Sequence, residues 1–156
     1  MLLLAVGAIA AAAPVIQKLL PAKGEVAKFG ILPDSLTYGK GDDIATIYDG
    51  GYELYTKNGV IDAARQMYQR DKDFVEVTVH TMKSPKAAVD FVKYWAKERG
   101  AKAVTSKSGA GFVVKKPTVM AYYAMGKYFV TVSAFHAPDK AIKDVNAFVS
   151  AIRKKT

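Results

Sequence analysis

Residues 44–60 read IATIYDGGYELYTKNGV, an aromatic stretch with two adjacent glycines. Its apolar positions recur every three or four residues, which is typical of one buried helix face. Asp42 or Asp43 precedes the pattern as a candidate N-cap, and Asn58-Gly59 supplies the left-handed residue that ends a helix. A neighbouring aromatic stripe on this predicted helix consists of Tyr48, Tyr52 and Tyr55.

Gly50 and Gly51 are unusual inside such a helix, because each costs about 1 kcal/mol relative to alanine. Two explanations remain open. Another strand or loop packs closely across the glycines, or a small molecule binds there in a pocket that a side chain would block. The second explanation makes the candidate ligand-binding residues Tyr48, Gly50, Gly51, Tyr52 and Tyr55.

The same stretch resembles a secreted bacterial domain family of unknown function, whose hallmark is an aromatic helix with an N/D-G-G core. The matching residues read IYDGGYELY at 47–55, followed by Asn58-Gly59. The order of elements is similar from about residue 32 to 152, with Ser84-Pro85 in a matching place. The chain departs from the family at Tyr52, where a small residue is expected. The resemblance implies an exported domain and a fold, and it carries over no catalytic residue.

Length and composition indicate one globular domain at residues 42–156. A chain of 156 residues, 51% of them hydrophobic, is long enough to bury a sizeable core. The absence of cysteine excludes disulfides, thiolate chemistry and cysteine-ligated metals, and it is compatible with export. The formal net charge of +9 is unevenly distributed, since residues 41–62 are acidic and residues 63–156 are strongly basic.

The N-terminal segment at residues 1–20 is apolar and precedes a Gly-, Pro- and Lys-rich linker at 21–41. Residues 2–13 carry no charge and end in alanines that a signal peptidase accepts, although no basic residue precedes them. Three fates stay open: a cleaved signal peptide, a retained segment buried in a neighbouring subunit, and a membrane anchor. A straight helix over 2–20 would reach only about 28 Å, short of a bilayer core.

The rest of the chain predicts an α+β fold. Strand patterns at 60–70 and 74–82 form a hairpin, and Ser84-Pro85 opens a helix that Gly100 ends. About four further strands lie between 104 and 135, and a last helix begins at Pro138-Asp139. We therefore expect a mostly antiparallel sheet of about five to six strands, with the helices packed on one face.

Candidate catalytic and metal-binding groups are few. Asp49 and Glu53 lie four residues apart on the predicted helix, as an acid–base pair would, but such pairs are usually a solvated face. His80 and His136 lie far apart in the sequence and lack a third ligand at diagnostic spacing. The sequence therefore predicts no catalytic residues, no metal site and no cofactor.

The stretch SKSGAG at residues 106–111 resembles a phosphate-binding loop. A P-loop requires its glycine-lysine pair directly before a helix, so that amides and the helix dipole converge on phosphate. Strands are expected on both sides here. We therefore interpret the stretch as a hairpin or a mobile loop.

Basic and aromatic residues alternate near the predicted 119–135 hairpin, as in a base-stacking platform. The residues concerned are Tyr122, Tyr123, Tyr128 and Phe129, with Lys115, Lys116 and Lys127 nearby. No RNA-binding motif accompanies them, so nucleic acid is not the expected partner. A protein partner, self-association, or an anionic surface of lipid headgroups or polysaccharide fits an exported basic protein better.

These features favour an exported, periplasmic or extracellular, non-enzymatic binding domain of unknown ligand. The alternative is a structural subunit of an envelope or extracellular assembly, with its apolar N-terminus packed into a neighbour or a membrane. Residues 2–20 are the segment through which such a protein would associate with a membrane.

Overall fold

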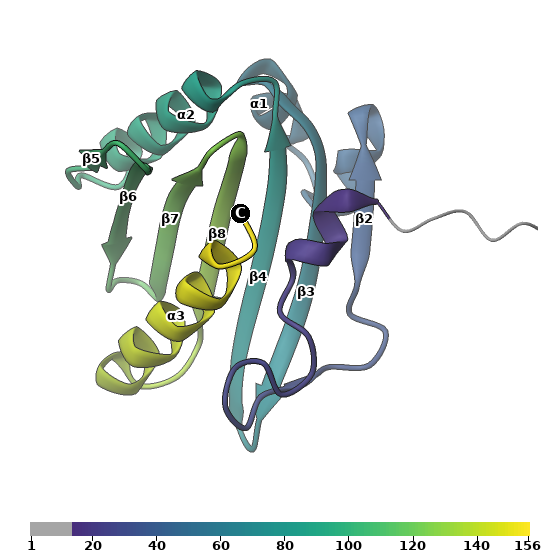
Figure 1. Cartoon of the computed structure of the whole chain (residues 1–156), viewed down its shortest axis with the longest axis vertical. Coiled ribbons are helices and arrows are strands. Elements are labelled where there is room, and N and C mark those ends of the chain that lie inside the picture. Colours follow the sequence, from purple (N-terminus) through teal and green to yellow (C-terminus); the bar gives the residue numbers. More distant parts are fainter. Residues whose placement is uncertain (1–13) are drawn as a thin grey trace, which may run out of the picture.

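A single antiparallel sheet of eight strands forms the centre of the protein, in a computed structural model that describes residues 14–156 (Figure 1). Its order is β1-β3-β4-β8-β7-β6-β5, and β2 also pairs with β3. The strands are β1 (Gly30–Ile31), β2 (Thr37–Lys40), β3 (Val60–Arg70), β4 (Asp73–Met82), β5 (Val104–Ser106), β6 (Gly109–Val114), β7 (Val119–Met125) and β8 (Tyr128–Ala134). The expectations for residues 1–13 lie outside the described residues.

Within residues 14–156, three α-helices and two 3₁₀-helices accompany the sheet: η1 (Val15–Leu19), η2 (Gly41–Thr46), α1 (Tyr52–Lys57), α2 (Pro85–Glu98) and α3 (Pro138–Arg153). The predicted start of α2 is confirmed, because the Ser84 side chain accepts a hydrogen bond of 3.0 Å from the amide of Ala87. The last helix also begins at its predicted proline. The α+β class predicted from the sequence is therefore correct.

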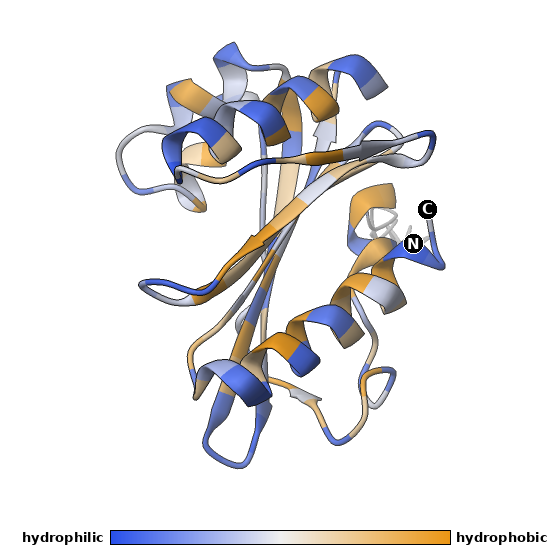
Figure 2. Ribbon diagram, turned by 90° about the vertical axis from the view of Figure 1, so that its left-hand side faces the viewer, coloured by the Kyte–Doolittle hydropathy of each residue, from blue (hydrophilic) through white to orange (hydrophobic). Residues whose placement is uncertain are grey.

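The helices cover both faces of the sheet, so the prediction of a single covered face was wrong. On β8, Phe129 faces a core formed with α2, whereas the next residue, Val130, faces a core formed with α3. Neighbouring strand residues point to opposite faces, and both of these are fully buried. Strands buried on both sides need a helix layer on each (Figure 2).

The two strands beyond the predicted six lie within residues 21–41, the stretch expected to be a linker. β1 pairs with β3 at Gln69 and Tyr68, and β2 pairs along 62–65 of the same strand. Both are short, so they leave little alternation in the sequence. Gly39 lets β2 turn tightly into η2, because a Cβ there would lie 2.2 Å from the carbonyl oxygen of Asp43.

The double-glycine stretch forms two short helices with a turn between them, which corrects the predicted single helix. Gly50 and Gly51 adopt φ angles of +67° and +115°, which interrupt the helical backbone. A Cβ at either glycine would meet nothing within 4 Å. The close-packing explanation for these glycines was therefore wrong, and their positive φ angles account for them instead. The predicted helix end at Asn58-Gly59 is confirmed.

Candidate functional site

Two tyrosines from the double-glycine segment stack on each other beside the sheet. Tyr48 lies in the turn before α1 and Tyr55 lies on α1; their ring centroids are 3.7 Å apart and nearly parallel. Both rings lie close to the imidazole of His80 on β4, at 5.8 and 5.7 Å. The hydroxyl of Tyr48 hydrogen-bonds to His80 Nε2. The turn at Gly50-Gly51 thereby carries its two flanking tyrosines onto the sheet.

His80 is fully buried and forms a neutral hydrogen-bonded pair with Tyr48. Its Nδ1 lies 2.7 Å from the carbonyl oxygen of Phe129, which only accepts, so Nδ1 carries the proton. Nε2 then accepts from the hydroxyl of Tyr48. Burial lowers the pKa of His80 to about 4, and burial also raises the pKa of Tyr48 well above its ordinary value. Both groups are therefore uncharged at neutral pH.

A small cavity of about 90 Å³ opens beside the stacked tyrosines, between α2 and the sheet. Its floor lies across three adjacent strands, where Thr78, Thr131 and Tyr122 are neighbours in register. The residues that line the cavity are Tyr48, Tyr55, Glu76, Thr78, Trp95, Arg99, Met120, Tyr122 and Thr131. Aromatic walls and a polar floor thus enclose one space.

Two polar groups at this cavity lack a partner within residues 14–156. The indole Nε1 of Trp95 is buried and makes no hydrogen bond. The carboxylate of Glu76, which is half-buried, forms no ion pair. Trp95, whose indole N–H has no acceptor, and Glu76, whose carboxylate forms no ion pair, therefore both belong to the lining of the same cavity.

Arg99 lies at the end of α2 and closes one side of the cavity. Its Nε donates a hydrogen bond of 2.9 Å to the hydroxyl of Tyr122. Its guanidinium carbon lies 5.8 Å from the ring centroid of Trp95 and 5.9 Å from that of Tyr122, within cation–π range. Burial raises the pKa of Tyr122, against which Arg99 acts in the opposite direction.

Only some of the candidate residues that the sequence suggested lie at this cavity. Tyr48 and Tyr55 line the cavity, whereas Tyr52 packs against the α2-side core outside the lining. Gly50 and Gly51 are exposed and shape the turn. The proposed acid pair, Asp49 and Glu53, is exposed and lies outside the lining of the tyrosine cavity.

Sequence reasoning missed most of the remaining lining residues. The available signal was on β4, where Glu76, Thr78 and His80 alternate with three valines. A strand buried on both sides that keeps one polar face indicates a site on that face. Trp95 lies within the helix predicted between Ser84-Pro85 and Gly100, but the sequence pattern does not mark it as a site residue.

The four aromatic residues that were weighed as a base-stacking platform do not form one surface. Tyr122 and Phe129 are buried in the α2-side core, whereas Tyr123 and Tyr128 pack against the α3-side core. The four rings therefore lie on opposite faces of the sheet.

A second titratable cluster lies at the start of α3. Ligand atoms of Asp73, His136 and Asp144 lie within 4.8 Å of one another, a spacing compatible with a metal ion. Arg70 Nη2, however, lies 2.5 Å from Asp144 and 3.0 Å from Asp73, and Lys140 lies 2.5 Å from Asp73. These cations already pair with the carboxylates, so the cluster is an ion-pair network.

The fold and the cavity define an α+β domain with an antiparallel sheet between two helix layers and one aromatic site. No known family model matches this sequence, and no curated protein sequence matches it. The structure is similar to the crystal structure of the extracellular domain of PknH from Mycobacterium tuberculosis, with a TM-score of 0.53 and 17% identity. That match covers 89% of this chain and 95% of the PknH domain, so the two share a fold. Between residues 14 and 156, no helix is both long and apolar enough to cross a bilayer.

Proposed function

We propose that this chain is an exported, non-enzymatic binding domain that holds a small polar group of its ligand in the cavity beside Tyr48 and Tyr55. The observation that carries the proposal is the buried, unpartnered indole N–H of Trp95 at the cavity wall. A buried donor without an acceptor costs about 1–3 kcal/mol. A ligand acceptor placed against Trp95 Nε1 would recover that free energy on binding.

The unpaired groups also indicate the chemistry of the ligand. Trp95 offers a donor, and the Glu76 carboxylate offers an acceptor. An amide, as in a peptide or an acetylated amino sugar, provides the complementary carbonyl and N–H in one small group. Because the cavity measures only about 90 Å³, it takes one such group and leaves the rest of the ligand outside.

Several observations support binding over catalysis. The Tyr48–His80 pair is neutral, and His80 is sealed from solvent, so it has no access to a substrate proton. Asp49 and Glu53, the only acid pair singled out in the sequence, are exposed away from the cavity.

Export is supported by two features of different kinds. The first is the uncharged apolar run at residues 2–13. The second is the shared fold with a domain that is extracellular in its own protein. The proposed location is therefore periplasmic or extracellular.

The experiment uses the fact that the chain has one tryptophan, so the indole gives a single side-chain N–H signal in an NMR spectrum. Acetamide and N-acetylglucosamine serve as amide probes, and glucose serves as the control without an amide. We expect a saturable shift of the indole signal with both amides and none with glucose. Equal shifts with glucose, or none with either amide, would refute the amide-binding proposal.

A second candidate function is a structural subunit, and one observation favours it. An apolar cavity of about 470 Å³ lies beside η1, where the described chain begins; its apolar lining includes Leu20, Pro21, Ala22, Ile31 and Leu36. Val15, at the start of η1, is 67% exposed. The N-terminal run of a neighbouring copy would cover this surface.

Intact-mass measurement and light scattering on the native protein test this alternative. A retained N-terminus with a stable oligomer, lost in the variant Leu36→Ser, would support the subunit. Loss of the first twelve or thirteen residues together with a monomer would rule it out.

A further inference from the structure

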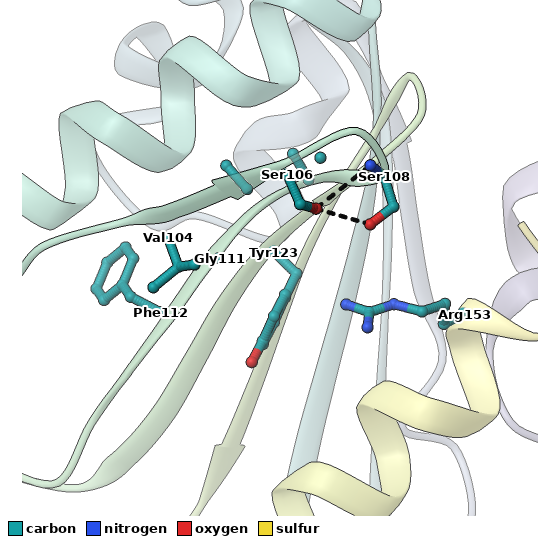
Figure 3. A pocket seen from close by; sticks show the side chains of 10 residues that line it. Val104, Ser106, Ser108, Gly111, Phe112, Tyr123 and Arg153 are labelled. Atoms are coloured by element: carbon teal, nitrogen blue, oxygen red, sulfur yellow. Dashed lines mark hydrogen bonds between the residues drawn. The ribbon is translucent and has the colours of Figure 1, made fainter.

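A groove on the α3 side of the sheet, remote from the tyrosine cavity, separates the β5–β6 hairpin from the end of α3. Its volume is about 280 Å³ (Figure 3). Ser106 and Ser108 line one wall and Arg153, in the last turn of α3, lines the other. A second cavity of about 390 Å³ shares Ser108 and Arg153 and adds Lys107. Neither lining contains an aspartate or glutamate.

The floor of the groove is fixed by a close approach between strands. Tyr123 on β7 lies flat over Gly111 of β6, where a Cβ would come within 2.2 Å of the tyrosine ring. Gly109 likewise faces the carbonyl oxygen of Ala124, which a Cβ would approach to 2.0 Å. The glycines of the SKSGAG stretch therefore serve strand packing, which brings Tyr123 to the floor of the groove.

Arg153 is held over this floor with its hydrogen-bond donors free. Its guanidinium carbon lies 5.3 Å from the ring centroid of Tyr123, a cation–π contact. Its side chain forms no ion pair with any residue between 14 and 156. Figure 3 shows the side chain directed toward the hairpin. A guanidinium offers five N–H donors, arranged to bind a phosphate or carboxylate at two points.

The opposite wall supplies a further donor. The hydroxyls of Ser106 and Ser108 lie 2.8 Å apart, so one donates to the other. The amide of Ser108 also donates to Ser106 Oγ, at 3.3 Å. One of the two O–H groups consequently remains available to a ligand, because each hydroxyl carries a single proton.

We propose that this groove binds a phosphate group, with Arg153 and the serine pair as donors from opposite walls. A tetrahedral phosphate presents oxygens in both directions, whereas a planar carboxylate satisfies the arginine fork alone. The net charge of +9 adds long-range attraction. The phosphate is carried either by a phospholipid headgroup or by a free phosphate ester.

The test is an NMR titration with glycerol 1-phosphate, with glycerol and sodium chloride at matched ionic strength as controls. We expect saturable shifts in the amide signals of residues 106–111 and Tyr123. Arg153→Gln is expected to weaken binding by about tenfold or more, because a charge-assisted pair is lost. Arg153→Lys keeps the positive charge but loses the two-point guanidinium contact, so its affinity should lie between those of the parent and of Arg153→Gln.

The matched control is Lys72→Gln, which removes one exposed cation from the β3–β4 turn. It should leave the affinity within about twofold of the parent, because a distant exposed charge is screened. If Lys72→Gln and Arg153→Gln weaken binding equally, the effect is one of net charge and the proposal is overturned. Absence of any saturable shift with glycerol 1-phosphate and of any vesicle binding overturns it as well.

Vesicles distinguish the two sources of phosphate. Sedimentation with phosphatidylglycerol vesicles that depends on Arg153, and is absent with phosphatidylcholine, supports a lipid headgroup. Binding of glycerol 1-phosphate without vesicle binding supports a free phosphate ester. Neither result bears on Trp95, so this proposal and the amide site succeed or fail separately.

Discussion

The two faces of the sheet have different cores. The α3-side core is built mainly from aliphatic residues, including Val77, Val79 and Val132, around the ring of Phe148. The α2-side core is built from stacked aromatic rings, and it also contains His80 and the cavity beside Trp95. The α3 side is packed mainly by aliphatic side chains, with its charged groups held in an ion-pair network, whereas the α2 side places His80 among aromatic rings.

This difference separates the core that we expect to contribute most to stability from the side on which we propose the amide site. Aliphatic side chains on the α3 side gain free energy through burial and leave no polar group to satisfy. On the α2 side, the unpartnered Trp95 N–H lowers stability by an amount that a ligand can restore. We therefore expect the aliphatic core on the α3 side to be the main source of stability, and the proposed amide site lies on the α2 side.

The largest expected effect is on the α3 side. Phe148 is fully buried, so Phe148→Ala should lower the free energy of unfolding by about 3–5 kcal/mol. Urea denaturation measures the loss. The Trp95 indole signal of the folded variant should stay at its parental position, and a large shift there would mean that the two cores are not independent.

The next effect is a pH dependence confined to the α2 side. His80 is buried and neutral with a pKa of about 4 in the folded protein, below the unfolded value of 6.5. The unfolded chain therefore binds the extra proton first, so this stability is complete above pH 6.5 and falls as the pH drops toward 4. The loss should reach about 3 kcal/mol.

Urea denaturation between pH 7 and pH 4 measures this dependence, and His80→Phe should remove most of it. The difference between the parent and the variant isolates His80 from the carboxylates that also titrate at low pH. An identical pH profile for both proteins would show that the pKa of His80 does not differ between the folded and the unfolded protein, and would contradict the account.

A third effect on stability is expected at the ion-pair network of Arg70, Asp73, His136 and Asp144 on the α3 side. Asp144 accepts from Arg70 and lies 2.7 Å from His136, and it is only 8% exposed. Asp144→Asn should cost about 1–3 kcal/mol, since Arg70 keeps only Asp73 as an acidic partner. Thermal unfolding at low and high salt measures this loss of stability. An unchanged melting temperature would mean that the ion-pair network does not stabilise the α3 side.

A smaller effect is expected at the turn that carries the tyrosines. Gly51 has a φ of +115° in open space, so Gly51→Ala should cost about 1–2 kcal/mol through backbone strain alone. Gly51→Asn should cost less, because asparagine tolerates positive φ better. Chemical denaturation compares the two. If Gly51→Asn lowers the stability more than Gly51→Ala does, a packing contact and not backbone strain determines the preference for glycine at this position.

The smallest expected change in stability is at the cavity itself. Trp95→Phe removes the unpartnered donor together with some packing, so the two terms oppose each other and the net change should stay within about 1 kcal/mol. Amide binding should nevertheless be lost. A variant that binds the amides as the parent does would remove Trp95 from the site.

The sequence predicts the elements whose signals are local. Ser84-Pro85, Asn58-Gly59 and the alternating valines of β4 each specify their structure through neighbouring residues, and these predictions hold. β1 and β2 depend on pairing with β3, thirty or so positions away, which no local pattern reveals. The glycine pair was misinterpreted because a helical spacing continues through a turn that interrupts the helix.

Only part of the candidate site could be found in the same way. Tyr48 and Tyr55 stand out within one aromatic stretch, but Trp95, Tyr122 and Thr131 join them only because three strands and α2 converge. These residues are far apart in the sequence, so no local pattern predicts that they meet. The polar alternation of β4 is the one local signal that indicates the cavity floor.

The most direct test of the central claim is to observe the Trp95 indole proton while N-acetylglucosamine is added. Our account predicts slow exchange with water, because the indole nitrogen is buried, and a saturable shift with magnetisation transfer between this proton and the acetyl methyl group. An indole proton that exchanges as in an exposed tryptophan, and that shows no transfer to the acetyl group, would contradict the account.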